Sequence, residues 1–294
     1  MIDPELTDRA LVARFAGESR VALEQLFTIE QQINESVRPS LAHEVAHARL
    51  DWWQQELTRL ADGTPRHPAT RTLSARCRAL GHSAPDLRAL VSLARRDLTA
   101  FTFVDEQELR SHFAAWGDSL FRTACLLVVP QSRRAGAERL AASAGRALRE
   151  LELLCDFSTY AQRGLILHPL GDATDTHANW QRLPLGPQEA QTLSMRLQHT
   201  RHELRLAAGA WAQSASREDR VALASMLSWC TLALTTAHDV QQALPNEHRS
   251  GRLAPLKRTW RAWHTTVTAG RGRVPTALVE LTRELPHSAL GNNP

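Results

Sequence analysis

Several features that mark membrane, secreted and redox proteins are lacking in this sequence of 294 residues. It has no run of about 18 or more apolar residues, so we expect no membrane-spanning helix. The first residues, MIDPELTDRALVARF, are acidic and polar and lack the apolar segment of a signal peptide. Cys77, Cys125, Cys155 and Cys230 form no CxxC pair and no zinc-ligand spacing, which favours buried free thiols. We therefore expect a cytoplasmic protein, with peripheral contact to the inner face of the membrane left open.

The sequence has a single lysine, Lys257, so its positive charge comes almost wholly from arginine. The 35 basic and 31 acidic residues leave a net charge of +4, unlike the polybasic arm of a nucleic-acid-binding protein. We expect no nucleic-acid partner. The small positive excess fits an anionic ligand or a membrane surface, and it equally fits neither. A glycine-rich phosphate loop and a nucleophile elbow are lacking as well.

Alternating strand patterns are also lacking. Apolar residues recur at helical spacing along nearly the whole chain, and glycine and proline fall between the periodic segments. The expected helices are 4–15, 18–37, 41–61, 68–80, 85–101, 105–129, the first part of 144–169, 188–214, 217–244 and 254–270. Residues 168–187 are predicted as a loop. The sequence therefore predicts an all-α protein with one helical domain over residues 1–285 and a disordered tail over residues 286–294.

The most informative stretch is 144–169, AGRALRELELLCDFSTYAQRGLILHP. Its leucines form one apolar face, and Asp156 follows directly on that face with Tyr160 four residues later. Gly164 and Pro169 are expected to end the helical run. A single carboxylate beside an apolar face has to be paired, hydrated or bound to a metal ion. Asp156 is therefore a candidate metal ligand, with a helix cap or a satisfied core group as the alternative.

A short motif at 43–47, HEVAH, matches the HExxH pattern of zinc hydrolases. In that pattern two histidines one helical turn apart bind zinc and the glutamate acts as a base; here they are His43, His47 and Glu44. No third ligand follows at the expected spacing, and Glu56 is too near in sequence. In a chain with 13 histidines we interpret the motif as a chance match on an exposed helix face, and its metal binding is left open.

The chain has eight tryptophans. Aromatic residues at helical spacing belong more often to a core than to a stacking surface, so we predict that they are mostly buried. The basic segment 252–273 carries Trp260 and Trp263. It is predicted as a helix that buries its tryptophans and exposes its charges, the alternative being contact with an anionic surface.

Several stretches together resemble the squalene/phytoene synthase family. RLDWWQQELTRLADGTPRHP at 49–68 resembles a family run of Arg-Leu, Trp, Glu-Leu, an acidic link and His-Pro. ARRDLTAFTFVDEQELRSHFAAWG at 94–117 and KRTWRAW at 257–263 resemble two further family segments. The stretch 144–169 resembles the second aspartate motif and the Gly-Arg-Val-Tyr-Leu-Pro loop after it. IEQQINESV at 29–37 is similar to the divergent branch that includes the family's mitochondrial complex I assembly factor.

The resemblance implies a terpenoid-synthase (isoprenoid synthase) fold, a helical bundle around a central cavity. Active family members condense two prenyl diphosphates head to head. Two aspartate motifs on facing cavity helices hold Mg²⁺ against the diphosphates. Magnesium suits this task because it prefers oxygen ligands and neutralises the departing diphosphate.

The first aspartate motif departs from the family pattern. It appears at 34–38, where Asn34 replaces an acid, Glu35 is kept as an acid, and Arg38 brings a positive charge to the last position. No shift of the alignment recovers an aspartate, because none lies between positions 8 and 51. Glu30 is the other acid nearby.

The second motif departs as well. Asp156 is kept, but Cys155 precedes it where the family has arginine, and Tyr160 stands in the place of the paired acid. The loop RGLILHP at 163–169 lacks the family's arginine and tyrosine. Glu35 and Asp156 are then the carboxylates left for a metal ion, which is few for a cluster of several magnesium ions.

These observations favour a squalene/phytoene synthase-like protein that has lost, or largely lost, prenyl transfer, and they leave open whether it is an enzyme. Such a protein would bind an isoprenoid or another lipid, or dock a protein partner as an assembly or regulatory factor. The alternative is an active Mg²⁺-dependent prenyltransferase of isoprenoid biosynthesis, in which Glu35 and Asp156 hold one metal ion and arginines clamp the diphosphates. A third reading is a pure interaction protein whose cavity is filled by side chains. The geometry of the central cavity distinguishes the three readings. An open, acid-lined cavity would favour the prenyltransferase, an open apolar cavity the lipid-binding protein, and a closed cavity the interaction protein.

Overall fold

The computed structural model describes residues 7–38, 40–99, 103–162, 166, 185–244 and 254–279, which form helices and no β-strand. The α-helices are α1 Asp8–Arg14, α2 Arg20–Glu35, α3 His43–Ala61, α4 Pro68–Ala79, α5 Arg88–Thr99, α6 Glu106–Trp116, α7 Arg122–Leu127, α8 Arg134–Cys155, α9 Phe157–Gln162, α11 Pro187–Ser214, α12 Arg217–Ala222, α13 Ala224–Ala243 and α14 Ala254–Gly270. Short 3₁₀ segments are η2 Gly17–Ser19, η4 Gln131–Arg133 and η5 Thr276–Leu278, and η3 Gly117–Phe121 is a π-helix. The all-α prediction is confirmed. The predicted tail and most of the predicted loop lie outside the described residues.

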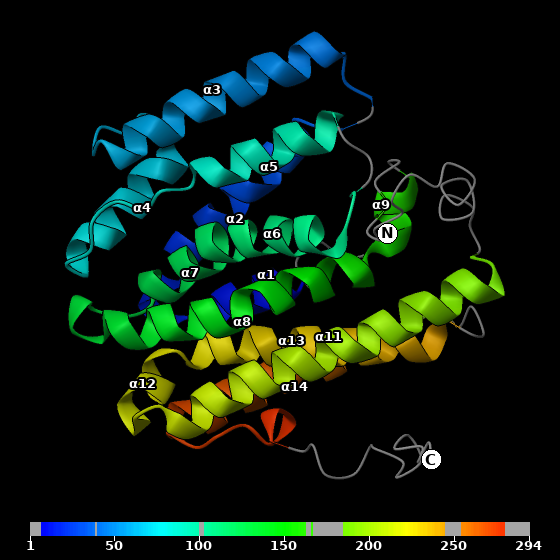
Figure 1. The fold of residues 1–294 in the computed structure, drawn as a ribbon. Helices are drawn as coiled ribbons and strands as arrows, with labels where there is room; N and C mark the ends of the chain where they lie inside the picture. The colour runs from blue at the N-terminus through cyan, green and yellow to red at the C-terminus, as the bar shows by residue number, and fades with distance from the viewer. Residues whose placement is uncertain are drawn as a thin grey trace.

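Helix α8 runs through the middle of the molecule, with α6 and α7 packed on one side and α11 and α13 on the other (Figure 1). Its apolar residues lie at helical spacing, and Leu140, Leu148, Leu151 and Leu154 are at most 1% exposed. Burying each such side chain stabilises the fold by about 1.5–3 kcal/mol. The apolar face of α8 is therefore the centre around which the other helices pack.

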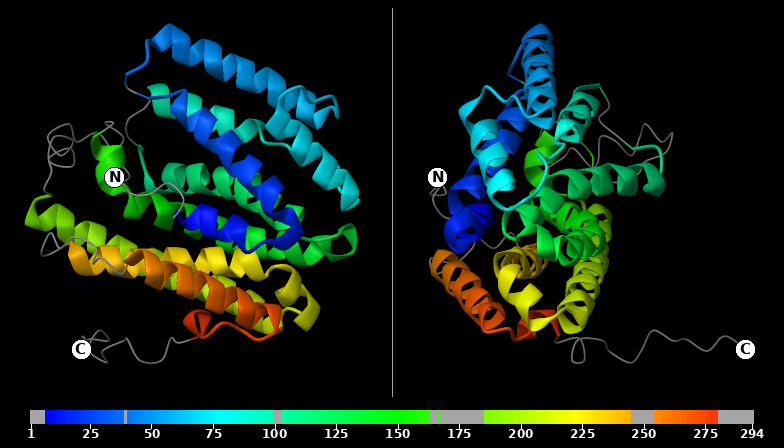
Figure 2. Two further views of the ribbon diagram at one scale, coloured as in Figure 1. Left: turned by 180° about the vertical axis from the view of Figure 1, so that it is seen from behind. Right: turned by 90° about the vertical axis from the view of Figure 1, so that its left-hand side faces the viewer.

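The first half of the chain forms its own group of helices beside α8. Helix α2 packs against α4 and α5, and α3 lies outside them at the edge of the molecule (Figures 1 and 2). Helix α4 begins at Pro68, where the fixed φ of proline suits the first helical position, and His67 accepts a hydrogen bond from Ala69 N at 3.3 Å. This arrangement leaves one face of α2 turned to α1.

The short helix α1 connects the start of the chain to its last helices. Thr7 caps it by accepting a hydrogen bond from Ala10 N at 3.2 Å. Asp8 then accepts from Arg258 Nη2 of α14 at 2.7 Å and from Thr236 Oγ1 of α13 at 3.2 Å. Because α1 also packs against α2, the next residue, Arg9, is held between α2 and α13.

The predicted helix over 105–129 is interrupted by the π-helix η3. Gly117 and Gly145 explain why the chain widens there: a Cβ on Gly117 would lie 2.6 Å from the carbonyl carbon of Gly145, so the two backbones are in contact. Trp116, which precedes the π-helix, and Phe121, its last residue, both lie edge to face with the ring of Trp229.

Two other predicted helix boundaries are corrected. The segment 217–244 divides at Leu223 into α12 and α13. Helix α8 ends at Cys155, and Asp156 is the turn residue that caps it by donating its N–H to Glu152 O at 3.2 Å. Asp156 O in turn accepts a hydrogen bond from Tyr160 N of α9 at 3.3 Å, so the chain turns at Asp156 and the next helix begins directly after it.

Most described tryptophans belong to the core, as predicted. The buried ones are Trp53, Trp116, Trp211 and Trp229. The prediction that α14 buries its tryptophans is wrong, because Trp260 and Trp263 are 59% and 48% exposed. Helix α14 packs through small side chains instead: Ala262, Thr265 and Ala269 are spaced three or four residues apart and are buried. The tryptophans project from its other faces.

The cysteines are free, and Cys77, Cys125 and Cys230 are buried, as predicted. Burial raises the pKa of Cys77 to about 11 and that of Cys230 to about 12, so these thiols remain protonated and inert. Within the described parts of the chain, no helix combines the length and the apolar character needed to cross a membrane.

Candidate functional site

The predicted first motif lies at the carboxyl end of α2. Glu35 Oε1 accepts a hydrogen bond from Arg38 Nη2 at 2.8 Å and another from Gln31 Nε2 at 3.0 Å. The side chains of Arg38 and Glu35 are 52% and 35% exposed, and Asn34 is half-buried. Glu35 is thus held by neighbours at its own helix end, in a partly solvated ion pair.

The predicted second motif lies where α8 ends. Asp156 is exposed, but nearby protein partly desolvates its carboxyl group. This desolvation, followed by the negative charge of Glu152, raises the pKa of Asp156, whereas the positive charges of Arg9 and Arg149 lower it. Tyr160 packs against a small apolar cluster of α6 and α8, and burial raises its pKa. The loop after α9 lies outside the described residues, apart from Ile166, which is buried.

The carboxylates that the structure brings together are Glu30 of α2 and Glu152 of α8, each one helical turn before a predicted position, Asn34 or Asp156. Arg9 of α1 lies between them. Its Nη1 donates to Glu30 Oε2, and its Nη2 donates to Glu152 Oε2 at 2.9 Å. Although burial by itself lowers it, the pKa of Arg9 is raised because Glu152 and Glu30 stabilise its charge. One guanidinium therefore binds two facing carboxylates.

A second cation and two indoles complete this network. Arg149 Nη1 lies 3.6 Å from Glu30 Oε1 and 3.8 Å from Glu152 Oε2. Trp116 Nε1 donates to Glu30 Oε1 at 2.8 Å, and Trp229 Nε1 donates to Glu152 Oε1 at 2.7 Å. Every oxygen of the two carboxylates therefore has a hydrogen-bond donor, as buried charges require. We call Arg9, Glu30, Arg149 and Glu152 the central charge network.

Aromatic rings fill the space beside the network. Trp229, which is fully buried, meets Phe27 edge to face at a ring distance of 5.1 Å and Phe121 at 5.5 Å. The Arg9 guanidinium carbon lies 5.7 Å from the ring centres of Phe27, Trp116 and Trp229. Such contacts favour a cation at this point and pack the region between α2, α8 and α13 with side chains.

The sequence did not identify Arg9, Arg149 or Glu152 as candidate site residues, and Glu30 stood out only as a nearby acid. One signal was present: Glu152 and Asp156 form an acid pair at i, i+4, the spacing that places two side chains on one helix face. Arg9 gave no signal, because its role depends on how α1 folds back between distant helices.

A third pair of titratable groups lies where α5 and α6 meet. His112 Nε2 of α6 is 3.9 Å from Asp97 Oδ1 of α5. Burial raises the pKa of Asp97 to about 6, and burial together with Arg149 lowers the pKa of His112 to about 3. At neutral pH a half-buried carboxylate thus faces an uncharged imidazole. Neither residue was singled out from the sequence.

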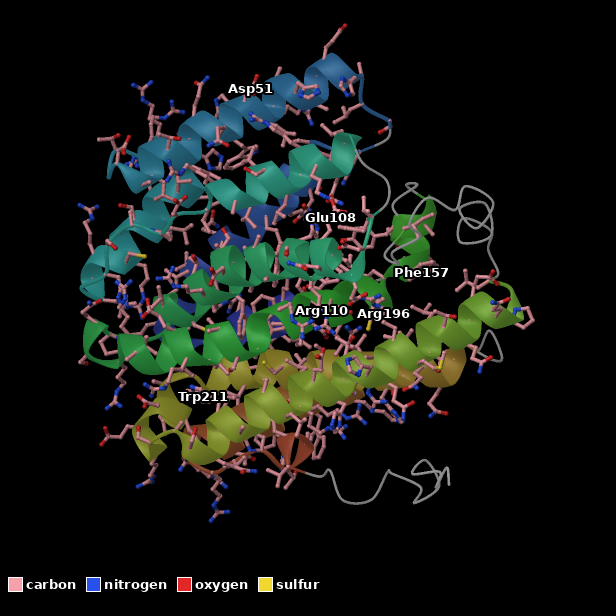
Figure 3. All side chains as sticks on the ribbon, in the orientation of Figure 1. Asp51, Glu108, Arg110, Phe157, Arg196 and Trp211 are labelled. Carbon is pink, nitrogen blue, oxygen red and sulfur yellow. The ribbon has the colours of Figure 1, made fainter. Side chains whose placement is uncertain are left out.

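Salt bridges also connect α6, α8 and α11 on the outer side of α8. Arg196 of α11 reaches Glu106 of α6 at 3.0 Å and Glu150 of α8 at 2.8 Å. Figure 3 shows Arg196 beside Arg110, which bonds to the same Glu106 at 3.2 Å. These contacts fix the position of α11 relative to the central helix and take no part in the central charge network.

The HEVAH motif lies on α3, at the outer edge of the molecule. His43 and Glu44 are exposed, and the rings of His43 and His47 meet at 4.4 Å. The predicted exposed face is confirmed. Glu56, two turns further along α3, is buried and accepts hydrogen bonds from Thr70 and from the backbone of the loop before α4, so it fixes that loop.

A family profile for squalene/phytoene synthase matches residues 17–261, which span α2 to the first half of α14. The chain belongs to the squalene/phytoene synthase family. Its all-α architecture agrees with the terpenoid-synthase-like fold that the resemblance implied. Searches of curated proteins and of solved structures found no match to the chain.

The magnesium ions that family membership implies do not fit the side chains now at this place. Glu30 and Glu152 are both bound by Arg9, so a metal ion would have to displace a guanidinium. Among the residues that the structure describes, no three His, Cys, Asp or Glu side chains converge as metal ligands. Glu35 is paired with Arg38 at its own helix end, and the cap bond of Asp156 uses its backbone N–H, so its exposed carboxylate takes no part in that bond.

Proposed function

We propose that this squalene/phytoene synthase-family chain does not condense prenyl diphosphates and acts instead as a binding protein, docking a partner as an assembly or regulatory factor. The observation that carries the proposal is the Arg9 guanidinium bound to Glu30 and Glu152. A positive charge that belongs to the chain stands between the carboxylates of the two facing helices. A Mg²⁺-dependent reaction needs such carboxylates free for the metal.

The filled centre supports this choice over the alternatives. Of the three cavity shapes considered, the closed one agrees best with Trp116, Trp229 and Phe27 packed around Arg9. An isoprenoid or another long lipid would have to displace these side chains to enter. An active prenyltransferase with an altered metal site would need Glu35 beside Asp156, whereas Glu35 bonds to Arg38. We extend the proposal to a cytoplasmic location with peripheral membrane contact.

Product analysis tests the proposal. The purified protein is incubated with farnesyl or geranylgeranyl diphosphate and Mg²⁺, with an active family member as the positive control. We expect no thirty- or forty-carbon product above the level without protein. Turnover that the Asp156→Ala variant abolishes would overturn the proposal and favour the active prenyltransferase.

Mass spectrometry of lipids extracted from the native protein separates the two non-enzymatic roles. We expect no isoprenoid at a stoichiometric level, because the centre is packed with side chains. A stoichiometric isoprenoid or other lipid would replace the docking role by lipid binding.

A further inference from the structure

Helix α14 has two faces of different chemistry, and it lies at the outer surface of the bundle (Figure 2). Its inner face consists of Ala262, Thr265 and Ala269, which are buried where α14 packs on α13. Its outer face carries Trp260 and Trp263, which are 59% and 48% exposed. Positions two apart on an α-helix lie on nearly opposite sides, so Trp260 is opposite Ala262 and Trp263 is opposite Thr265. Both tryptophans therefore point away from the helices that α14 packs on.

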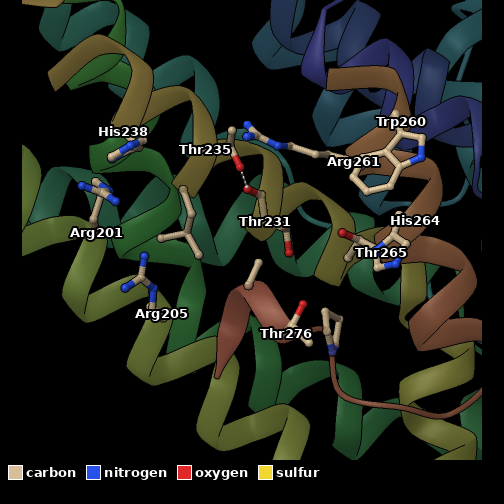
Figure 4. A pocket seen from close by; sticks show the side chains of 13 residues that line it. Arg201, Arg205, Thr231, Thr235, His238, Trp260, Arg261, His264, Thr265 and Thr276 are labelled. Carbon is tan, nitrogen blue, oxygen red and sulfur yellow. Dashed lines mark hydrogen bonds between the residues drawn. The ribbon is translucent and has the colours of Figure 1, made fainter. Parts of the chain in front are cut away.

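The aromatic surface continues along the outer face of α14. Trp260, Trp263 and the half-buried Val267 lie at i, i+3 and i+7, the spacing of one helix face. The Trp260 indole stacks on the exposed His264 at a ring distance of 5.1 Å and an angle of 22°. Figure 4 shows these two rings at the edge of a cavity of about 650 Å³, so the Trp260 indole is not part of the core packing. Large exposed apolar surface of this kind typically marks a contact site.

The charge around this face is of one sign. The sequence between Glu247 and Glu280 contains no aspartate or glutamate. The basic side chains of α14 and of the turn after it are Lys257, Arg258, Arg261, Arg271 and Arg273. Arg258 is bound to Asp8. The side chains of the other four make no ion pair or hydrogen bond with any residue that the structure describes.

The acids on the helices that pack against α14 compensate this charge only in part. Asp8 of α1 is taken up by its pair with α14, at 2.7 Å. Both acids of α12, Glu218 and Asp219, are bound by Arg133. The acid of α13 is Asp239, which is exposed. These pairings leave an excess of positive charge around the outer face of α14.

Tryptophan beside positive charge suits an anionic membrane surface. An indole has an apolar body and a polar N–H, and it settles at the level of the lipid headgroups. Lysine and arginine are attracted to the negative potential of anionic lipids. A second copy of the chain docked through the same face would bring like charges together. Soluble protein surfaces carry both signs interspersed, whereas an anionic membrane is negative throughout.

We propose that the outer face of α14 docks the protein on an anionic membrane surface. Trp260 and Trp263 enter the headgroup layer, and Lys257 and Arg271 contact lipid phosphates. The inference rests on the membrane contact included in the proposed function, and it names the face and the lipid chemistry. This face shares no residue with the central charge network. Membrane binding can therefore fail while the product analysis still finds no prenyl transfer.

Co-sedimentation tests the proposal with vesicles of phosphatidylcholine alone and of phosphatidylcholine mixed with phosphatidylglycerol. Poly-L-glutamate, followed by calorimetric titration, represents an acidic protein surface. The decisive variants are Trp260→Ala and Lys257→Gln. The matched controls are Trp52→Ala, whose indole is 44% exposed on α3, and Arg20→Gln, which removes a charge from an exposed pair on α2. Far-UV circular dichroism verifies that the four variants are folded.

We expect binding to the phosphatidylglycerol vesicles that is stronger than binding to phosphatidylcholine alone and that weakens as salt is added. Trp260→Ala should weaken it about 5- to 30-fold, because the apolar area of the indole is lost from the interface. Lys257→Gln should weaken it about fivefold, the contribution of one basic residue near a charged membrane.

The two control variants should change the affinity less than about twofold, since their side chains lie on other helices. Binding to neither kind of vesicle would overturn the proposal. Binding to poly-L-glutamate alone would also overturn it, in favour of an acidic protein partner. Equal weakening by Trp260→Ala and Trp52→Ala would contradict the assignment of α14 as the docking face.

Discussion

Removing the Arg9 guanidinium should be among the most destabilising single changes at a charged position of this protein. In Arg9→Met the side chain keeps an apolar stem of similar length but no longer neutralises Glu30 and Glu152. The Glu30 side chain is 2% exposed. After the change it keeps one indole hydrogen bond, from Trp116 at 2.8 Å, and a more distant cation, Arg149 at 3.6 Å. A buried carboxylate would then be only partly compensated.

The expected cost follows from measured buried pairs. Breaking a buried ion pair by removing one partner costs about 3–5 kcal/mol, because a charge is left without its neutralising group. The Arg9 side chain is 25% exposed, which places the change near the lower end, about 3 kcal/mol. The matched control is Arg20→Met. Its pair with Glu24 is exposed on both sides, at 57% and 40%, and should be worth about 0–1 kcal/mol.

Urea denaturation followed by circular dichroism and tryptophan fluorescence measures both variants. A double-mutant cycle of Arg9→Met with Glu30→Gln isolates the pair. The double variant should be more stable than the sum of the single effects predicts, since the uncompensated charge is gone. Additive effects, or an Arg9→Met cost within about 0.5 kcal/mol of the Arg20→Met cost, would refute the assignment of a buried, mutually dependent network.

Three further predictions concern packing and titration. Gly117→Ala should lower the free energy of unfolding by about 1–3 kcal/mol in urea denaturation, because the added Cβ would lie 2.6 Å from the backbone of Gly145. Gly270→Ala is the control: its Cβ would enter open space, and the change should be neutral or slightly stabilising. Trp229→Phe should cost about 2–4 kcal/mol in the same assay, since it empties core volume and removes the indole bond to the partly buried Glu152. A loss under about 1 kcal/mol would contradict this. The folded-state pKa of Asp97, about 6, lies above its unfolded value. The contribution of Asp97 to the free energy of unfolding is therefore present at low pH and is lost as the pH rises from about 4 to 6. As the pH rises from about 4 to 6, the free energy of unfolding of Asp97→Asn should therefore increase relative to the wild type by up to about 2–3 kcal/mol. His112 acts in the opposite direction: its folded-state pKa of about 3 makes the free energy of unfolding fall as the pH falls below about 6.5, and the Asp97→Asn variant should show this dependence. A constant difference between the two proteins from pH 4 to 6 would be evidence against this assignment.

The fold was largely accessible from the sequence because it depends on local periodicity. Leucine spacing predicted α8, and prolines and glycines predicted most helix ends. The π-helix at Gly117 was not accessible, since it depends on contact with Gly145, distant in sequence. Likewise, the exposed Trp260 could not be distinguished from a core residue, because both have helical spacing.

The candidate site was only partly accessible. The family resemblance pointed to Asn34 and Asp156, whereas the acids that the structure brings together are Glu30 of α2 and Glu152 of α8, each one turn earlier. The reason is physical: a motif gives positions along one helix, whereas Arg9 reaches those acids from a third helix. Residues that act through contacts between distant segments leave no pattern in a single sequence.

The most direct test of the central claim is whether a metal ion or the chain's own arginine neutralises Glu30 and Glu152. Mn²⁺, a paramagnetic substitute for Mg²⁺, is titrated into the purified protein while electron paramagnetic resonance follows the free ion. We expect the free Mn²⁺ signal to rise as it does in buffer, with no stoichiometric site. Binding of one or more equivalents per chain, lost in the Glu152→Gln variant, would contradict the account.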